Sequence, residues 1–184
     1  MSSASLECYF KCQYGGGNPL KTTVCNQINK KVQVMQQFLL PVQTPVLNDR
    51  LVIEAWDYNS VSSDSQLGSL ILSAKKLIAE GAKEGGVFLW KNIYGSPAEQ
   101  TGDAADAMDK NPDIASQWKG QVLIHVKAEE NDKPRKGVEK VGQEQKKSED
   151  DEENKGPPPV NWKVEAQKAN FFEKEDYEIM IEIG

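Results

Sequence analysis

Residues 57–65 bring acidic, amide and hydroxyl side chains together in the sequence DYNSVSSDS. The candidate metal ligands in this stretch are Asp57, Asn59, Asp64 and Ser65. Oxygen ligands of this kind suit a hard cation such as Ca²⁺, which accepts about six to eight of them in irregular geometry. One apolar run, at 51–56, precedes the stretch and another, at 67–72, follows it. The sequence therefore predicts a loop between two strands that offers oxygen ligands to calcium.

The strands that position this loop are visible as alternating apolar residues. In LVIEAW, at 51–56, apolar side chains recur at every second position, as in a strand with one buried face. Similar signals predict seven strands, at 6–14, 20–26, 32–42, 51–56, 67–73, 87–94 and 121–126. In the strand at 87–94, Phe88 and Trp90 are expected on opposite faces. Short helices are expected at 74–82 and 103–108, the second capped by Asp103. Short strands at roughly even spacing with turns between them favour an all-β, antiparallel β-sandwich.

Composition narrows the class of protein. The chain has 184 residues, a net charge of −6 and a mean hydropathy of −0.61, which suits one domain with polar tails. No apolar run approaches the roughly 18 residues of a membrane span. The N-terminus does not combine a basic region with a long apolar run, so we expect a cytoplasmic protein. A nucleic-acid partner is not expected, because no basic stripe is interleaved with aromatic residues.

Other reactive residue types are few. Cys8, Cys12 and Cys25 are odd in number, and we interpret them as reduced thiols of a cytosolic protein. The single histidine, His125, lies in an apolar strand and is interpreted as structural. Carboxylate pairs such as those at 103 and 106 lie in polar stretches, where burial does not tune a pKa. The sequence therefore predicts a protein that is not an enzyme.

The chain divides into three parts by composition. Residues 1–128 contain the seven predicted strands, and 129–159 form a charged linker that ends in Pro157, Pro158 and Pro159. This linker is expected to be disordered, because it has almost no large apolar side chains. Two more strand signals follow in 160–184.

Three motifs resemble a known family. RLVIEAWDYNSVSSDSQLGSLILS at 50–73 resembles the calcium loop 3 region of a C2 domain. FLWKNIYGSP at 88–97 and ASQWKGQVLIHVKAE at 115–129 are most similar to C2 domains of ferlins. The resemblance implies an eight-stranded C2-type sandwich that serves membrane trafficking or vesicle fusion without catalysis. It also implies a peripheral position on the cytosolic face of membranes, in a larger and tail-anchored parent protein.

The resemblance leaves one strand of the sandwich open. The family's first strand, which precedes its calcium loop 1, has no counterpart before residue 6, whereas 162–184 resembles the opening of a following C2 domain. The C-terminal segment either begins that next domain or completes this sandwich. We favour the second alternative, with 162–169 folded back into the vacant position, since an open sheet edge invites strand addition.

The resemblance also bears on ligands. The family's loop 3 carries aspartates at positions one, three and nine, which correspond here to Asp57, Asn59 and Ser65, while Asp64 lies one residue early. Fewer charged ligands imply at most weak Ca²⁺ binding, and no cofactor is otherwise expected.

Two kinds of partner follow from the resemblance: an anionic phospholipid surface, or a neighbouring C2 domain or other protein bound without calcium. The lipid-contact candidates are Val61, Lys11, Lys21, Lys30 and Lys31. The alternative interpretation of these five residues is an ordinary solvated surface.

Overall fold

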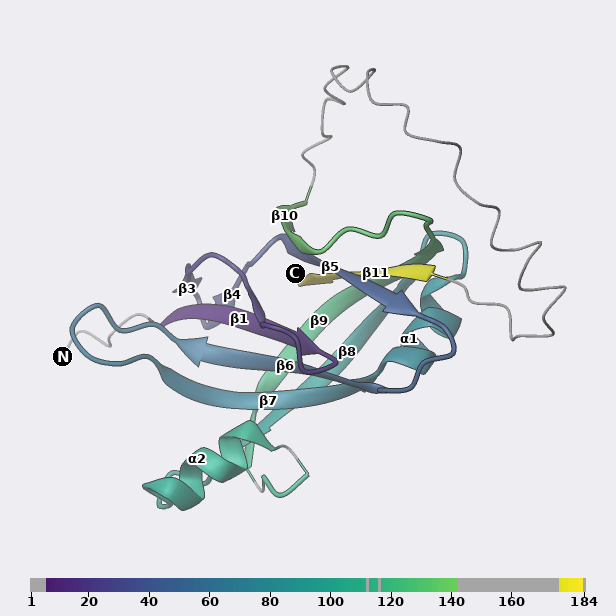
Figure 1. Ribbon diagram of the computed structural model, residues 1–184. Helices are drawn as coiled ribbons and strands as arrows, with labels where there is room; N and C mark the ends of the chain where they lie inside the picture. Colours follow the sequence, from purple (N-terminus) through teal and green to yellow (C-terminus); the bar gives the residue numbers. More distant parts are fainter. Residues whose placement is uncertain (1–5, 112, 116, 142–175, 184) are drawn as a thin grey trace, which may run out of the picture.

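A computed structural model describes residues 6–111, 113–115, 117–141 and 176–183 (Figure 1). Antiparallel strands dominate it, with two short helices. The strands are β1 (Glu7–Tyr14), β2 (Leu20–Lys21), β3 (Cys25–Ile28), β4 (Lys31–Val32), β5 (Gln36–Gln43), β6 (Arg50–Asp57), β7 (Ser65–Ser73), β8 (Val87–Gly95), β9 (Gln117–Glu130), β10 (Gly137–Lys140) and β11 (Asp176–Ile183); the helices are α1 (Ala74–Gly81) and α2 (Asp103–Lys110).

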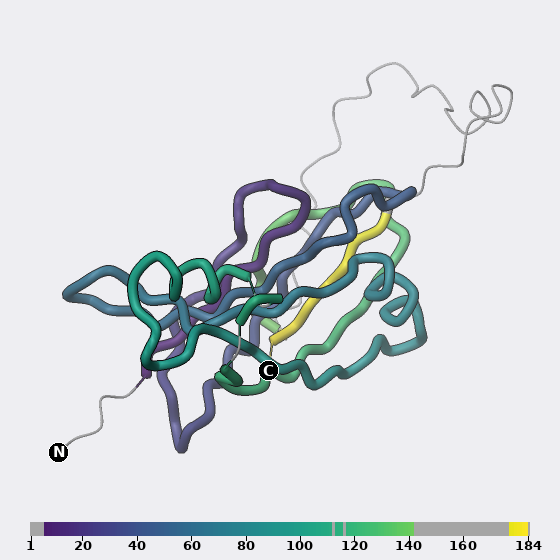
Figure 2. The backbone as a smooth tube through the Cα atoms, turned by 90° about the horizontal axis from the view of Figure 1, so that it is seen from below, coloured from purple at the N-terminus to yellow at the C-terminus, as the bar shows by residue number. Residues whose placement is uncertain are grey.

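The strands form one curled antiparallel sheet in the order β10-β5-β11-β9-β8-β7-β6-β1-β3-β4, with β2 paired to β1. The sheet turns a corner between β7 and β8, where Ser69 and Tyr94 form the one registered pair. The half with β1, β6 and β7 therefore lies against the half with β8, β9, β11 and β5 (Figure 2). This arrangement confirms the predicted all-β, antiparallel sandwich.

The described residues contain eleven strands rather than the expected eight, because two predicted strands are interrupted and β10 was not predicted. The predicted strand at 20–26 splits at Thr22, whose side-chain oxygen accepts a hydrogen bond from the Phe10 N–H at 2.9 Å. The predicted strand at 32–42 splits before β5 at Met35, which has a φ of 48°. A side chain that replaces a backbone partner, or a left-handed residue, ends regular pairing locally.

The core lies between the two halves of the sheet. Leu51, Ile53 and Ala55 of β6 are at most 4% exposed, as their alternation predicts. Ile179, Ile181 and Ile183 of β11 are fully buried in the same cluster. Residues at the very end of the described chain are therefore as deeply buried as those of the central strands.

Strand β11 lies inside the sheet, between β5 and β9 (Figure 2). Its ladder with β5 runs from the pair Asp176↔Gln43 to the pair Ile183↔Gln36, and it pairs with β9 over a similar length. A C-terminal segment thus completes this sandwich. The segment proposed for that role from the sequence, 162–169, lies outside the described residues.

The predicted linker begins too early at 129. Strand β9 continues to Glu130, and β10 pairs with β5 through the register Gly137↔Leu39 to Lys140↔Gln36. The prediction relied on the low apolar content of this segment. Backbone pairing and ion pairs nevertheless hold residues 137–140 in the sheet. The remainder of the predicted linker, from 142 onwards, lies outside the described residues.

Both predicted helices are present. Helix α1 is capped by Ser73, whose side chain accepts from the Lys76 N–H. Helix α2 corrects the prediction that Asp103 is its cap: Gly102 holds that position with a φ of 70°, and Asp103 lies in the first turn. No helix in the described part of the chain is long and apolar enough to cross a membrane.

Candidate functional site

The 57–65 loop joins β6 to β7 and projects from one end of the sandwich, while α1 lies at the other end (Figure 1). Asp57 and Ser65 are opposite each other in the β6–β7 ladder. The register shifts between Ala55 and Trp56, just before the loop. The structure therefore gathers Asp57, Asn59, Asp64 and Ser65 on one loop, as the sequence predicts.

The loop uses two of these residues to hold its own shape. One carboxylate oxygen of Asp64 accepts from the Tyr9 hydroxyl at 2.8 Å, and the other accepts from the Asn59 N–H at 3.1 Å. The Asn59 side-chain oxygen accepts from the N–H groups of Val61 and Ser62, at 3.0 and 3.2 Å. Oxygens that the sequence offers to a cation are therefore engaged by donors of the protein itself.

These hydrogen bonds shift the pKa values of Asp64 and Tyr9 in opposite directions. The Asn59 N–H and then the Tyr9 hydroxyl lower the pKa of Asp64, because both stabilise its carboxylate. Burial, followed by the bond to Asp64, raises the pKa of Tyr9. Within the described residues, no cluster of three or more histidine, cysteine, aspartate or glutamate side chains is arranged to hold a metal ion. Calcium binding that is at most weak stays a prediction.

Beside the loop, two lysines lie over two aromatic rings; we call Tyr9, Trp56, Lys11 and Lys21 the lysine–aromatic platform. Tyr9 and Trp56 are register partners and stack at 6.2 Å with an interplanar angle of 9°. The Lys11 ammonium is 3.5 Å from the centre of the Trp56 ring, and that of Lys21 is 3.7 Å from the centre of the Tyr9 ring. Cation–π attraction therefore holds both charges on one surface.

The sequence identified the two lysines but missed the rings that order them. Part of this arrangement is visible in the sequence, because Tyr9 and Lys11 alternate with Cys8 and Cys12 and so share one face of β1. Trp56 comes to lie opposite Tyr9 when β1 pairs with β6. That pairing joins segments more than forty residues apart, so β1 alone does not reveal it.

The other lipid-contact candidates lie on different turns. Val61, at the tip of the 57–65 loop, is 94% exposed. Lys30 belongs to the β3–β4 turn, where it and Asn29 have positive φ, and Lys31 begins β4. The neighbouring Ile28 is 71% exposed. The platform therefore contains Lys11 and Lys21, whereas Lys30 and Lys31 form a separate basic turn.

A second surface feature was not foreseen: an aromatic face on the outer side of β8 and β9. It consists of Phe88, Trp90, Tyr94 and Trp118, which are 67%, 65%, 36% and 58% exposed. The expectation that Phe88 and Trp90 lie on opposite faces is wrong, because residues two apart in a strand share a face. Tyr94 and Trp118 are register partners across the strands.

Polar side chains fix the aromatic face in place. The Trp118 indole N–H donates to the Asn92 side-chain oxygen at 3.3 Å, and the Gln121 amide donates to the same oxygen at 3.0 Å. The Asn92 amide in turn contacts the Tyr94 hydroxyl at 3.5 Å. Trp118 and Tyr94 thus have polar partners within the protein, while much of the ring surface of the aromatic face remains in solvent.

His125 connects three elements. Its Nε2 atom lies 2.8 Å from the Gly85 carbonyl oxygen, and its Nδ1 atom lies 3.5 Å from a Glu182 carboxylate oxygen of β11. Its ring stacks on Phe88 with centroids 4.3 Å apart. These contacts agree with the structural role predicted for this residue.

The sequence of the chain is similar to part of a ferlin. No family model matches the chain. The chain is 23% identical over 156 residues to Ferlin 2 of Tetrahymena thermophila. The match covers 77% of this chain but 9% of that protein, so the chain spans less than a tenth of the relative's length. Together with the antiparallel sandwich, this similarity supports a C2-like module related to part of a ferlin.

Proposed function

We propose that this chain is a non-catalytic C2-type module of a ferlin-like membrane-trafficking protein, peripherally associated with anionic phospholipid on the cytosolic face. The lysine–aromatic platform is the observation that carries this proposal. The assignment to trafficking rests on the similarity to a ferlin and is an argument by analogy.

The platform suits a lipid headgroup layer for two physical reasons. A lysine near an anionic surface contributes about 1 kcal/mol, and the rings hold two such charges together beside the 57–65 loop. Tryptophan favours the boundary between water and lipid, and the half-buried Trp56 ring lies beneath the Lys11 ammonium. Tyr9 is 1% exposed and contributes from below, by holding Lys21. Val61 projects from the same loop and offers an apolar side chain for shallow insertion.

The proposal includes weak or absent dependence on calcium. Asp64 and Asn59 are bonded to donors of the protein, so the loop is held in shape without a cation. Binding then rests on the lysines and falls as salt screens them.

Vesicle co-sedimentation tests the proposal. The chain is mixed with vesicles of phosphatidylcholine alone or with phosphatidylserine, in Ca²⁺ or in a chelator. We expect it to pellet with the anionic vesicles in both conditions and to lose most binding in the double variant Lys11→Ala/Lys21→Ala. The matched control, Lys75→Ala/Lys76→Ala, removes the same charge from exposed positions on α1 and is expected to bind normally.

The aromatic face favours a second candidate, a calcium-independent protein-interaction module. At their exposed fractions, the four rings present roughly 450 Å² to solvent, within the range of functional patches on soluble proteins. The partner would be a neighbouring C2 domain or another protein. Tryptophan and tyrosine are enriched at the centre of such interfaces.

A pull-down of the neighbouring domains of the parent protein tests this candidate. Trp90→Ser is expected to abolish capture, and Leu47→Ser, which removes another highly exposed apolar side chain, is expected to leave it unchanged. Vesicle binding that depends on Trp90 but not on Lys11 and Lys21 would instead place the lipid contact on the aromatic face.

A further inference from the structure

Cys8 of β1 and Cys25 of β3 lie directly opposite each other in an antiparallel ladder. Opposed residues in such a ladder project from the same face of the sheet, with Cα atoms about 4.5–5.5 Å apart. A disulfide needs Cα atoms about 4.4–6.8 Å apart. Both cysteines are free thiols here: Cys8 is 4% exposed and belongs to the core, and the half-buried Cys25 packs against that core.

The neighbouring hydrogen bonds define the kind of pair that these residues form. The Gln27 N–H donates to the Leu6 carbonyl at 2.8 Å, so Leu6 and Gln27 form a hydrogen-bonded pair. Because pair types alternate along an antiparallel ladder, Cys8 and Cys25, two positions further on, are again a hydrogen-bonded pair. Their Cα atoms are then about 5.5 Å apart, within the range of disulfides. The Cβ atoms of such a pair are also about 5.5 Å apart, so the bond requires the two strands to approach each other by about 1 Å.

We propose that Cys8 and Cys25 are a modification site that forms a reversible cross-strand disulfide when the chain meets a hydroperoxide. Cys12 takes no part, although it lies on the same face of β1 as Cys8. Its ladder partners are Leu20 and Ile53, and it is 1% exposed. This inference stands apart from the proposed function.

The reaction proceeds in two balanced steps. The Cys25 thiolate attacks one peroxide oxygen, the O–O bond breaks, and a sulfenic acid forms with release of water or an alcohol. The Cys8 thiolate then attacks the Cys25 sulfur, the S–O bond breaks, and water leaves as the S–S bond forms. Two thiols are oxidised by two electrons in total, and the hydroperoxide is reduced. Cys25 reacts first because its sulfur is the more accessible of the two.

The position of Cys8 in the sheet decides which elements the new bond would hold together. Asp57 is the residue opposite Cys8 on β6, at the start of the 57–65 loop. The new bond would thus fix β3 to β1 beside the base of that loop.

The tryptic map makes the test direct, because each cysteine falls in a different peptide. Cleavage after Lys11, Lys21 and Lys30 places Cys8 in 1–11, Cys12 in 12–21 and Cys25 in 22–30. The full chain is treated with hydrogen peroxide, alkylated, digested without reductant and analysed by mass spectrometry. We expect peptide 1–11 joined to 22–30 with the loss of two hydrogen atoms, and we expect dithiothreitol to release the two peptides.

Two variants sharpen the result. Cys25→Ser should abolish the cross-link, and the control Cys12→Ser should retain it, with circular dichroism confirming that each variant is folded. A cross-link that includes 12–21, a dimer joined through two Cys25 residues, or peroxide treatment that leaves Cys8 as a free thiol would each overturn the proposal.

Discussion

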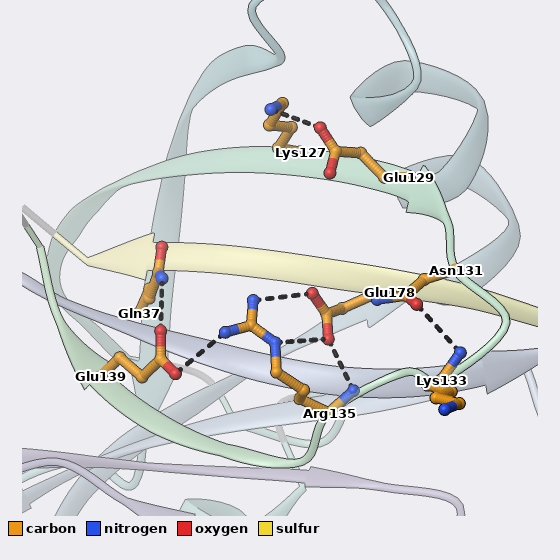
Figure 3. A network of polar contacts seen from close by, with 8 residues as sticks. All are labelled: Gln37, Lys127, Glu129, Asn131, Lys133, Arg135, Glu139 and Glu178. Carbon is orange, nitrogen blue, oxygen red and sulfur yellow. Dashed lines mark hydrogen bonds and ion pairs between the residues drawn. The ribbon is translucent and has the colours of Figure 1, made fainter. Parts of the chain in front are cut away.

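The Glu178 carboxylate of β11 accepts hydrogen bonds from the backbone N–H and the guanidinium of Arg135, which precedes β10 (Figure 3). The shortest of these bonds, from the Arg135 N–H, measures 2.6 Å. Glu178 is 3% exposed, and the arginine also reaches Glu139 on β10 at 3.2 Å. This pair fastens the C-terminal strand to the segment before residue 142.

Arg135→Ala is expected to destabilise the fold by about 2–3 kcal/mol, because it leaves the buried Glu178 carboxylate with the backbone N–H alone. Urea denaturation followed by circular dichroism measures this loss. The control is Arg50→Ala, since Arg50 pairs with Asp113 on an exposed surface at 3.5 Å. Exposed pairs contribute at most about 1 kcal/mol, so equal losses in the two variants would contradict a special role for Arg135.

Ile181→Ala is expected to cost about 3 kcal/mol, since it opens a cavity beside a fully buried side chain. Met180→Ala, on the adjacent and outward-facing position of β11, should cost clearly less. Chemical denaturation of both variants gives the comparison. The reverse order, or no loss in either variant, would show that β11 does not occupy the sheet between β5 and β9.

Hydrogen exchange offers an independent measurement of the same strand. The amides of β11 pair with β5 and β9 on both sides, so those of 178–182 should exchange as slowly as the amides of β6. The β3–β4 turn around Lys30 serves as the fast-exchanging control. Rapid exchange throughout 178–182 would mean that the strand is not held in the ladder.

Local pattern predicted much of the fold. Alternation identified β6 and β7, and apolar residues at helical spacing indicated α1. The Ser73 cap of α1 was not predicted. These features depend on neighbours in sequence. The pairing of Arg135 with Glu178 joins residues forty-three positions apart, so low apolar content alone suggested disorder where the sheet continues to residue 140.

In the candidate site, too, features set by neighbours in sequence were predicted, whereas contacts between distant segments were not. Composition placed oxygen ligands on one loop, and the structure keeps them there. It did not reveal that Asp64 bonds to Tyr9, because β1 lies fifty-five residues away. The aromatic face was missed for a simpler reason: period-two alternation places Phe88 and Trp90 together, and the prediction separated them.

Acid should weaken the anchoring of the 57–65 loop. The Asp64 pKa lies below its usual value of about 4, so its bonds contribute stability that is complete above that pH and disappears as pH falls through the lowered pKa. We expect Asp64→Asn to lower the melting temperature near neutral pH, with the difference from wild type shrinking below about pH 4. Asp132→Asn, at an exposed loop position, is the matched control and should show no such convergence.

Calcium titration tests whether the 57–65 loop binds a cation. Isothermal calorimetry with millimolar Ca²⁺ is expected to give no saturable heat, because the Asp64 carboxylate already accepts from Tyr9 and Asn59, and the Asn59 oxygen accepts from two N–H groups. A cation would have to replace these bonds, with fewer charged ligands than a tight site requires. The double variant Asn59→Asp/Ser65→Asp restores two charges on the same loop and should produce measurable heat. Saturable binding by the unaltered chain at low micromolar Ca²⁺ would show that the loop rearranges to release Asp64, and Tyr9→Phe, which removes one of its donors, should then bind calcium more tightly still.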